Sequence, residues 1–363
     1  MTEKSGPLKG VRIVEFAGIG PGPFACMLMA DMCADIVTVA RKGQIKADAG
    51  NFTQRGRRVI EVDLKAKEGV EAALELIGKA DILIEGFRPG VMERLGLGPD
   101  VALKKNAKLV YGRMTGWGQE GPLAQAAGHD INYIAITGAL DSFRASNGEL
   151  VSPLNLVGDY GGGAMYLVVG VLAGLIEART SGKGQVVDAA MCDGASSLIT
   201  MFHALAAMGT WTDKPRTNLL DGGAHFYRVY ETKDGKHFSL GAIEPQFYKE
   251  FLERAGIDDK AFEAQNERGG WTNLSDKLAA IFKTKTRDEW SKLLEGTDAC
   301  AMAVQALHEA PNHPHLKARG TFVERDGKLQ PAPAPRFSRT PSAIGSSPKT
   351  APVDVKEALA AWA

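Results

Sequence analysis

Short apolar runs alternate with stretches of helical periodicity through the first half of the chain. Residues 11–17 form an apolar run, a glycine-rich loop and an apolar helical stretch lead to residue 34, and residues 35–40 form a second run. This pattern predicts a β-α-β unit. It continues through strands at 59–63, 81–85 and 109–112 and helices at 68–80 and 95–108. Alternating strands and helices predict a parallel sheet covered on both faces.

The pattern then changes towards helices and a hairpin. A helix is predicted at 165–179, a strand at 185–190 and a helical segment at 194–208. Residues 226–240 alternate in polarity and turn at Asp234-Gly235, which predicts a β-hairpin. Further helices are expected at 246–255, 274–282 and 287–296. The fold class is therefore α/β, with a large Rossmann-like parallel sheet and a smaller α/β domain.

The proline-rich stretch 330–341 is expected to be extended, because proline removes backbone donors. A short helix at 355–362 is expected to dock on the first domain. We predict four regions: a large domain at 1–190, linker helices at 191–225, a small domain at 226–322 and a return segment at 323–363.

Charge and cysteine content exclude several classes of function. The chain has 363 residues with 43 basic and 43 acidic side chains, so no net positive field attracts nucleic acid or an anionic membrane. Its four cysteines form no CxxC pair, which indicates neither a zinc site nor a disulfide framework. The apolar stretch 164–176 is too short to cross a bilayer and predicts a buried helix. With a polar start at residues 1–9, a cytoplasmic protein without metal is expected.

The loop after the first strand resembles a nucleotide-binding loop only weakly. Pro23 occupies the third glycine position of a GxGxxG pattern, and Arg41 stands where an NAD site has an acidic residue. Arginine suits a phosphate, such as that of NADP or coenzyme A. Further basic residues follow other strands, where ligands of open α/β sheets bind.

Longer motifs are more specific than these spacings. They are GFRPGVMERLGLG at 86–98, RMTGWGQEGP at 113–122, GHDINY at 128–133, GDYGGG at 158–163 and IEPQF at 243–247. In these motifs the chain resembles the α-methylacyl-CoA racemases of the class III CoA-transferase (CaiB/BaiF) superfamily, over essentially its whole length.

The resemblance implies a two-domain chain in an interlocked homodimer, with each active site between the large domain of one subunit and the small domain of the other. It implies His129 and Asp159 as catalytic bases and Glu244 of the other subunit as a partner of the histidine. The positions implied around coenzyme A are Arg41, Val62, Leu64, Lys65, Gly86, Arg88, Arg94, Gly128 and Tyr133. At residues 42–43 this chain has Lys-Gly where the family commonly has proline. No cofactor beyond the coenzyme A moiety of the substrate is expected.

Racemising a 2-methylacyl thioester requires a base on one face of the α-carbon and an acid on the other. Histidine serves either role near neutral pH, whereas aspartate acts as an acid only with a raised pKa, which we predict for Asp159. The enolate oxygen also needs a hydrogen-bond donor to stabilise its negative charge. The chain enters a helical pattern at His129, so the amide of Asp130 is the expected oxyanion donor.

Other interpretations remain open on the sequence. Asp159 also suits a helix N-cap, Glu244 a first-turn carboxylate before Pro245, and a lone His129 a structural histidine. A CoA-transferase would use Asp159 as a covalent nucleophile, and a non-catalytic NADP- or CoA-binding module would need no acid/base pair. The acyl group is open among branched fatty acyl, sterol side-chain, bile-acid and aryl-propionyl thioesters.

Overall fold

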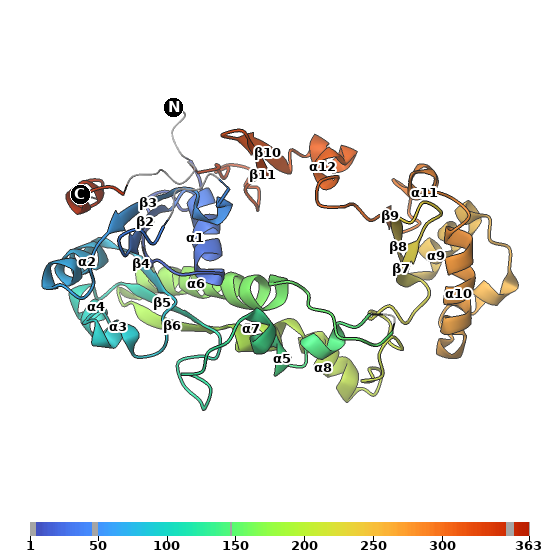
Figure 1. Cartoon of the computed structure of the whole chain (residues 1–363), viewed down its shortest axis with the longest axis horizontal. Coiled ribbons are helices and arrows are strands. Elements are labelled where there is room, and N and C mark those ends of the chain that lie inside the picture. Colours follow the sequence, from blue (N-terminus) through green and yellow to red (C-terminus); the bar gives the residue numbers. More distant parts are fainter. Residues whose placement is uncertain (1–4, 46–49, 146, 346–351, 363) are drawn as a thin grey trace. The chain divides into compact units, whose positions relative to one another are not determined.

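The computed structural model describes residues 5–45, 50–145, 147–345 and 352–362 (Figure 1). It divides into two compact units. Unit 1 comprises Met1–Ala139, Pro153–Ile199 and Lys317–Ala363, and unit 2 comprises Leu140–Ser152 and Thr200–Leu316. These units group the chain differently from the predicted domains, since residues 191–199 and 317–322 fall in unit 1 and residues 140–152 and 200–225 in unit 2.

Unit 1 is built on a parallel sheet of six strands in the order β3-β2-β1-β4-β5-β6. The strands are β1 (Arg12–Phe16), β2 (Asp35–Ala40), β3 (Arg57–Glu61), β4 (Ile82–Glu85), β5 (Val110–Thr115) and β6 (Gln185–Ala190). This is the strand order of dinucleotide-binding folds, in which the chain direction across the sheet reverses between β1 and β4. The Rossmann-like parallel sheet expected from the sequence is confirmed.

Helices cover both faces of this sheet. Ile13 packs on the face under α1 (Pro21–Asp31) and α6 (Met165–Ser181), whereas its neighbour Val14 packs on the opposite face. The second face lies under α2 (Lys67–Lys79), α3 (Val91–Arg94), α4 (Pro99–Lys105) and α13 (Val355–Ala360) (Figure 1). Trp362 is 2% exposed in this second core. The predicted docking of the C-terminal helix on the large domain is confirmed.

Two predicted helices are wrong in extent. The stretch 95–108 does not form one helix, because α3 ends before Gly96, Gly98 intervenes, and α4 starts at Pro99. The segment 194–208 is likewise two helices, α7 (Met191–Leu198) and α8 (Thr200–Ala207). The strand at 59–63 is found two residues earlier, as β3.

The helix α6 continues a π-helix, η3 (Leu156–Ala164). The buried helix expected at 164–176 is confirmed for Leu167, Val171 and Leu175, which lie in the core. The helical run Leu156–Ser181 is longer than expected, and by length and composition alone it is long and apolar enough to cross a membrane. Half of its most apolar window is buried inside the protein.

A buried ion pair and a hydrogen bond from the same arginine tie the glycine loop and the edge strand β3 to the sheet. Arg57 Nη1 donates to both carboxylate oxygens of Glu15, at 2.7 and 2.6 Å. The side chains of Arg57 and Glu15 are 0% and 1% exposed. Arg57 Nη2 also donates to the carbonyl of Pro23 at 3.3 Å. The site loop after β1 is therefore anchored from β3.

Unit 2 contains a smaller antiparallel sheet and helices. Its strands, β7 (Tyr227–Glu231), β8 (His237–Gly241) and β9 (Ala301–Ala303), pair in that order. The helices α9 (Pro245–Ala255), α10 (Trp271–Phe282) and α11 (Arg287–Leu294) enclose an aromatic core with Phe238, Phe282 and Trp290. The predicted hairpin and smaller α/β domain are confirmed.

After α12 (Pro314–Ala318) the chain forms a hairpin of β10 (Phe322–Arg325) and β11 (Lys328–Pro331). No helix occurs in the proline-rich stretch 332–341, all of which is described. Residues 330–331 belong to β11, whereas bends at 334–335 and 338–340 interrupt the rest, so the extended conformation predicted there is found only in part.

His225 makes the stability of unit 2 sensitive to acid. Its ring is 0% exposed, and Nε2 lies 2.7 Å from the Tyr248 hydroxyl. Burial lowers its pKa to about 4. Below its ordinary pKa of about 6.5, the unfolded chain binds a proton that the folded chain does not, so stability falls as pH decreases from there towards 4. We expect a loss of about 2 to 3 kcal/mol between pH 7 and 4.5. Urea unfolding at both pH values tests this, and the His225→Gln variant should lose this part of the pH dependence.

Candidate active site

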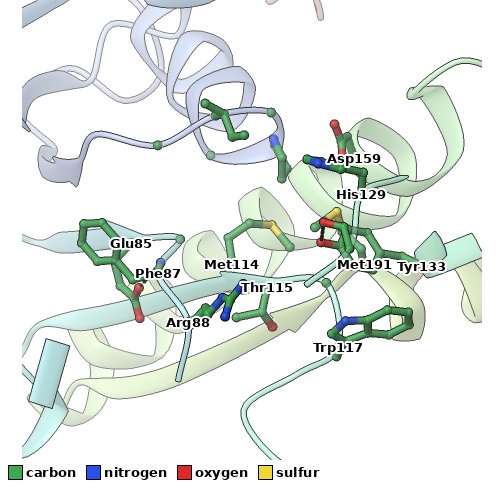
Figure 2. A pocket seen from close by; sticks show the side chains of 18 of the residues that line it. Glu85, Phe87, Arg88, Met114, Thr115, Trp117, His129, Tyr133, Asp159 and Met191 are labelled. Carbon is green, nitrogen blue, oxygen red and sulfur yellow. Dashed lines mark hydrogen bonds between the residues drawn. The ribbon is translucent and has the colours of Figure 1, made fainter. Parts of the chain in front are cut away.

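A cavity of about 740 Å³ lies at the carboxyl ends of the strands of unit 1 (Figure 2). Most of its lining comes from the ends of β1, β4 and β5 and the segments after them, and the rest from Gln44 after β2, Asp159, and Met191 directly after β6. The strand order reverses between β1 and β4, and ligands of such sheets bind at this switch point. The cavity is therefore where the fold itself predicts a ligand.

The glycine loop after β1 approaches Asp159 closely. Gly20 has φ +69°, and a Cβ atom there would lie 3.0 Å from Asp159 Oδ2. Phe24 stacks on Tyr160 with ring centroids 4.1 Å apart. The backbone conformation at position 20 favours glycine, and a side chain there would also crowd the Asp159 carboxylate. Ile19, in the same loop, is 82% exposed at the cavity.

His129 is the N-cap residue of α5 (Asp130–Ala135). Its backbone is extended, and its N–H donates to Asn132 Oδ1 at 3.0 Å. The side chain is exposed and lines the cavity. The helix entry predicted at His129 is confirmed, and it leaves the imidazole available to a ligand.

Asp159 is half-buried and lines the same cavity. Figure 2 shows His129 and Asp159 at one end of the cavity, with Glu85 and Phe87 at the other. Asn155 Nδ2 donates to Asp159 Oδ2 at 3.2 Å. Burial raises the pKa of Asp159, the hydrogen bond from Asn155 opposes this, the Asp130 charge adds to it, and a His129 charge lowers it. The predicted raised pKa is confirmed.

Asp159 is not a helix N-cap. It lies inside the π-helix η3, whose N-cap is Asn155. The N-cap interpretation was wrong because the helix begins four residues earlier than the glycine-rich sequence GDYGGG suggests. π-Helices are rare and frequently occur at functional sites.

Glycines let η3 pack tightly on α7. A Cβ atom on Gly194 would lie 1.8 Å from the Gly162 carbonyl oxygen, and one on Gly162 would lie 2.7 Å from the Ala195 nitrogen. Because both obstacles are backbone atoms, a side chain at either position would move the helix that carries Asp159.

We therefore expect Gly194→Ala to destabilise the protein by about 1 to 3 kcal/mol, as overpacked cores do, and to impair any activity that uses Asp159. Gly22→Ala is the matched control, since a Cβ there meets no atom within 4 Å. Urea midpoints of the two variants measure the difference. Equal midpoints would show that η3 adjusts without cost.

The remaining wall of the cavity carries several predicted ligand-binding residues. Gly86 and Arg88 come from the loop after β4, and Gly128 and Tyr133 flank His129. The Tyr133 hydroxyl donates a short hydrogen bond to the Gly128 carbonyl, and its ring packs edge-on against Trp117. The structure brings these four residues together with His129 and Asp159.

A second cavity, of about 530 Å³, lies beside the end of β3. Leu64, Lys65 and Arg94 line it, so three further predicted positions cluster there. Arg41 is exposed and, like Val62, lines neither cavity. The Arg41 backbone N–H donates to Gln44 Oε1 at 3.0 Å, and Gln44 lines the first cavity. Val62 packs against the sheet core.

Glu244 lies in unit 2, as the N-cap residue of α9 with Pro245 following. This position at the start of a helix agrees with the interpretation of Glu244 as a carboxylate near the first turn, before Pro245. Among the described residues, no group of three or more His, Cys, Asp or Glu side chains could hold a metal ion.

Sequence reasoning missed Asn155 and Asn132, which hold Asp159 and His129. Asn155 precedes Asp159 by four residues, about one helical turn, but the helix start was placed too late for this spacing to be noticed. Asn132 follows His129 by three residues, the spacing of a capping box. That signal was present in GHDINY.

The chain is similar to known proteins over most of its length. The model of CoA-transferase family III matches residues 8–352. Two proteins named alpha-methylacyl-CoA racemase are similar over 336 residues, covering 92% of this chain and 87% of each relative; the Mus musculus protein is 42% identical and the Homo sapiens protein 38%.

A solved structure shares the fold. The crystal structure of the hypothetical protein Rv3272 from Mycobacterium tuberculosis superposes with a TM-score of 0.81 and 25% identity, covering 97% of this chain and 98% of that one. The likeness extends over both units.

Proposed function

The chain belongs to CoA-transferase family III, and from this premise we propose that it is an α-methylacyl-CoA racemase. It interconverts (R)- and (S)-2-methylacyl-CoA thioesters by 1,1-proton transfer. The observation that carries the proposal is that His129 and Asp159 line one cavity, since the reaction needs two acid/base groups around a single carbon.

In the proposed reaction one of the two residues removes the proton from C2 and the C–H electron pair moves into the thioester, giving an enolate. The other residue then donates a proton to the opposite face of C2, which inverts the centre. The raised pKa of Asp159 supports this role, because it brings the carboxyl closer to the range in which it both gives and takes protons.

The enolate oxygen requires a preorganised donor, since general acid/base catalysis alone supplies only about 10² to 10⁴ in rate. The Asp130 amide is at the first position of α5, where helical N–H groups have no acceptor within the helix. We assign it as the oxyanion donor, worth roughly 3 kcal/mol.

The coenzyme A moiety follows the carboxyl edge of the sheet. Gly86, Arg88, Gly128 and Tyr133 face the thioester end, and Leu64, Lys65 and Arg94 face the nucleotide end. Arg41 and Val62 follow neighbouring strands and complete the proposed contacts. No other cofactor is required.

The alternative is a class III CoA-transferase, in which Asp159 attacks the thioester and forms a covalent intermediate. His129 favours the racemase. A transferase needs no second base at this position, whereas inversion does.

The test follows a single enantiomer of a 2-methylacyl-CoA in D₂O. Racemisation with incorporation of deuterium at C2 is expected. Retained optical purity without deuterium, across branched fatty acyl, sterol, bile-acid and aryl-propionyl thioesters, would refute the proposal. Transfer of coenzyme A to an added carboxylate such as succinate would favour the alternative.

We further propose a cytoplasmic homodimer that binds neither nucleic acid nor membrane. Exposed apolar side chains, such as Val169 and Ile176 of α6, support a partner surface. In this dimer Glu244 of one subunit holds His129 of the other.

If so, mixing His129→Gln subunits with Glu244→Gln subunits should restore activity, because mixed dimers contain one site with both native residues. Refolding the two inactive variants together, against each refolded alone, measures this. Absence of any recovery would place Glu244 and His129 in one chain or separate their roles.

A further inference from the structure

The side chain of Asp130 connects the two segments that carry the acid and base groups. Asp130 follows His129 directly and is the first residue of α5. Its Oδ2 accepts a hydrogen bond of 2.6 Å from the backbone N–H of Asp159, 29 residues further on. One carboxylate therefore links the backbone beside His129 to the backbone of Asp159.

The N–H of Asp159 needs an acceptor from outside its own helix. In η3 the N–H of Tyr160 donates to the carbonyl of Asn155, five residues back. Asp159 precedes Tyr160, so its N–H belongs to the first turn, where helical donors have no internal partner. A π-helix leaves one more such donor than an α-helix, and Asp130 supplies its acceptor.

The neighbouring residues make room for this contact. A Cβ atom on Gly158 would lie 2.4 Å from Asp130 Oδ2. Asp130 itself is 8% exposed, and its Oδ1 is buried without a hydrogen-bond partner in the described part of the chain. A buried unpaired acceptor costs stability, which indicates that the carboxylate has a use beyond packing.

We propose that Asp130 is a positioning residue that holds Asp159 at a fixed place relative to His129, and that inversion at C2 depends on it more than proton removal does. This inference rests on the proposed racemase function, because only a reaction with bases on two faces depends on their separation. His129 has a separate support, the hydrogen bond from its N–H to Asn132. Loss of the Asp130 carboxylate therefore displaces Asp159 more than His129.

The consequence is a change in the fate of the enolate. When His129 removes the proton from C2 in D₂O, the imidazolium exchanges it for deuterium. With Asp159 displaced, the deuteron returns from His129 to the same face, so a C–D bond replaces the C–H bond and the configuration is retained. The rate of deuterium exchange with retained configuration therefore rises relative to the rate of inversion, and so does the ratio of the two rates.

The experiment measures this ratio in D₂O for both enantiomers. Asp130→Ala removes the acceptor, Asp130→Asn keeps an oxygen for the Asp159 N–H, and Gly158→Ala pushes the carboxylate away while leaving Asp130 and Asp159 intact. Inversion is expected to fall about 10- to 100-fold in both alanine variants, with a rise in the ratio for one enantiomer. Asp130→Asn is expected to keep the wild-type ratio.

A merely structural role would lower exchange and inversion in proportion, and an unchanged ratio in the alanine variants would overturn the proposal. So would a ratio in Asp130→Asn as altered as in Asp130→Ala, and this variant keeps the side-chain shape if the alanine variants fail to fold. Wild-type protein that neither racemises nor exchanges would instead refute the racemase function.

Discussion

The Asp159→Asn variant is expected to lose racemisation by about 10² to 10⁴, the contribution of a positioned general acid or base. Asparagine keeps the size of the side chain and a hydrogen-bonding oxygen but has no proton to give or take. One enantiomer of a 2-methylacyl-CoA, the one whose C2 proton faces His129, should still exchange with D₂O and keep its configuration. The other should be inert.

The His129→Gln variant is the matched control, and it should show the opposite preference. Exchange should then be limited to the enantiomer whose proton faces Asp159. Mass spectrometry of C2 combined with chiral separation measures both quantities. The racemase mechanism fails if His129→Gln racemises normally, and a transferase is favoured if that variant also transfers coenzyme A while Asp159→Asn does not.

Much of the large unit follows from local patterns in the sequence. The strands β2 and β6 are found at the predicted residues, 35–40 and 185–190. β2 is a buried run of apolar and β-branched residues with clear ends. β6 is a largely exposed edge strand, which its two adjacent valines and the glycine before it made recognisable. Helix boundaries near glycine were harder to predict from the sequence. Gly96 and Gly98 break a periodic stretch that reads as one helix, and glycine costs a helix only about 1 kcal/mol.

The acid/base pair could not be found from pattern alone. His129 and Asp159 are 30 positions apart, and they meet because α5 and η3 pack at the same edge of the sheet. Family motifs identified them. The π-helix was not predictable, since its stability depends on tertiary contacts such as Asp130 Oδ2 with the Asp159 N–H rather than on propensity.

The pKa of Asp159 illustrates what chemistry adds to the motif. The reaction requires an aspartate that is not permanently ionised, so a raised pKa could be predicted before any contact was known. Its cause, burial beside the Gly20 loop and the Asp130 charge, is a property of the fold. The reaction thus predicts that the pKa of Asp159 is raised, and the packing around Asp159 explains how it is raised.

Replacing Arg57 with leucine is expected to cost about 3 to 5 kcal/mol of stability, because it leaves the buried Glu15 carboxylate without its counter-charge. Glu15 is 1% exposed and would keep only uncharged partners among the described residues, the Thr38 hydroxyl at 2.5 Å and the Cys26 thiol. Urea unfolding measures the loss. The adjacent Arg58→Leu is the matched control: its partner Asp35 is 42% exposed, and exposed pairs contribute less than about 1 kcal/mol.

The double variant Glu15→Leu with Arg57→Leu separates the two causes of this loss. If an unpaired buried charge is responsible, removing both partners should recover most of the stability, since apolar replacements of buried ion pairs are often neutral or stabilising. If the double variant stays as unstable as Arg57→Leu, the loss comes from the Pro23 carbonyl, which Arg57 also binds. Arg57 would then act chiefly as the anchor of the glycine loop beside Asp159.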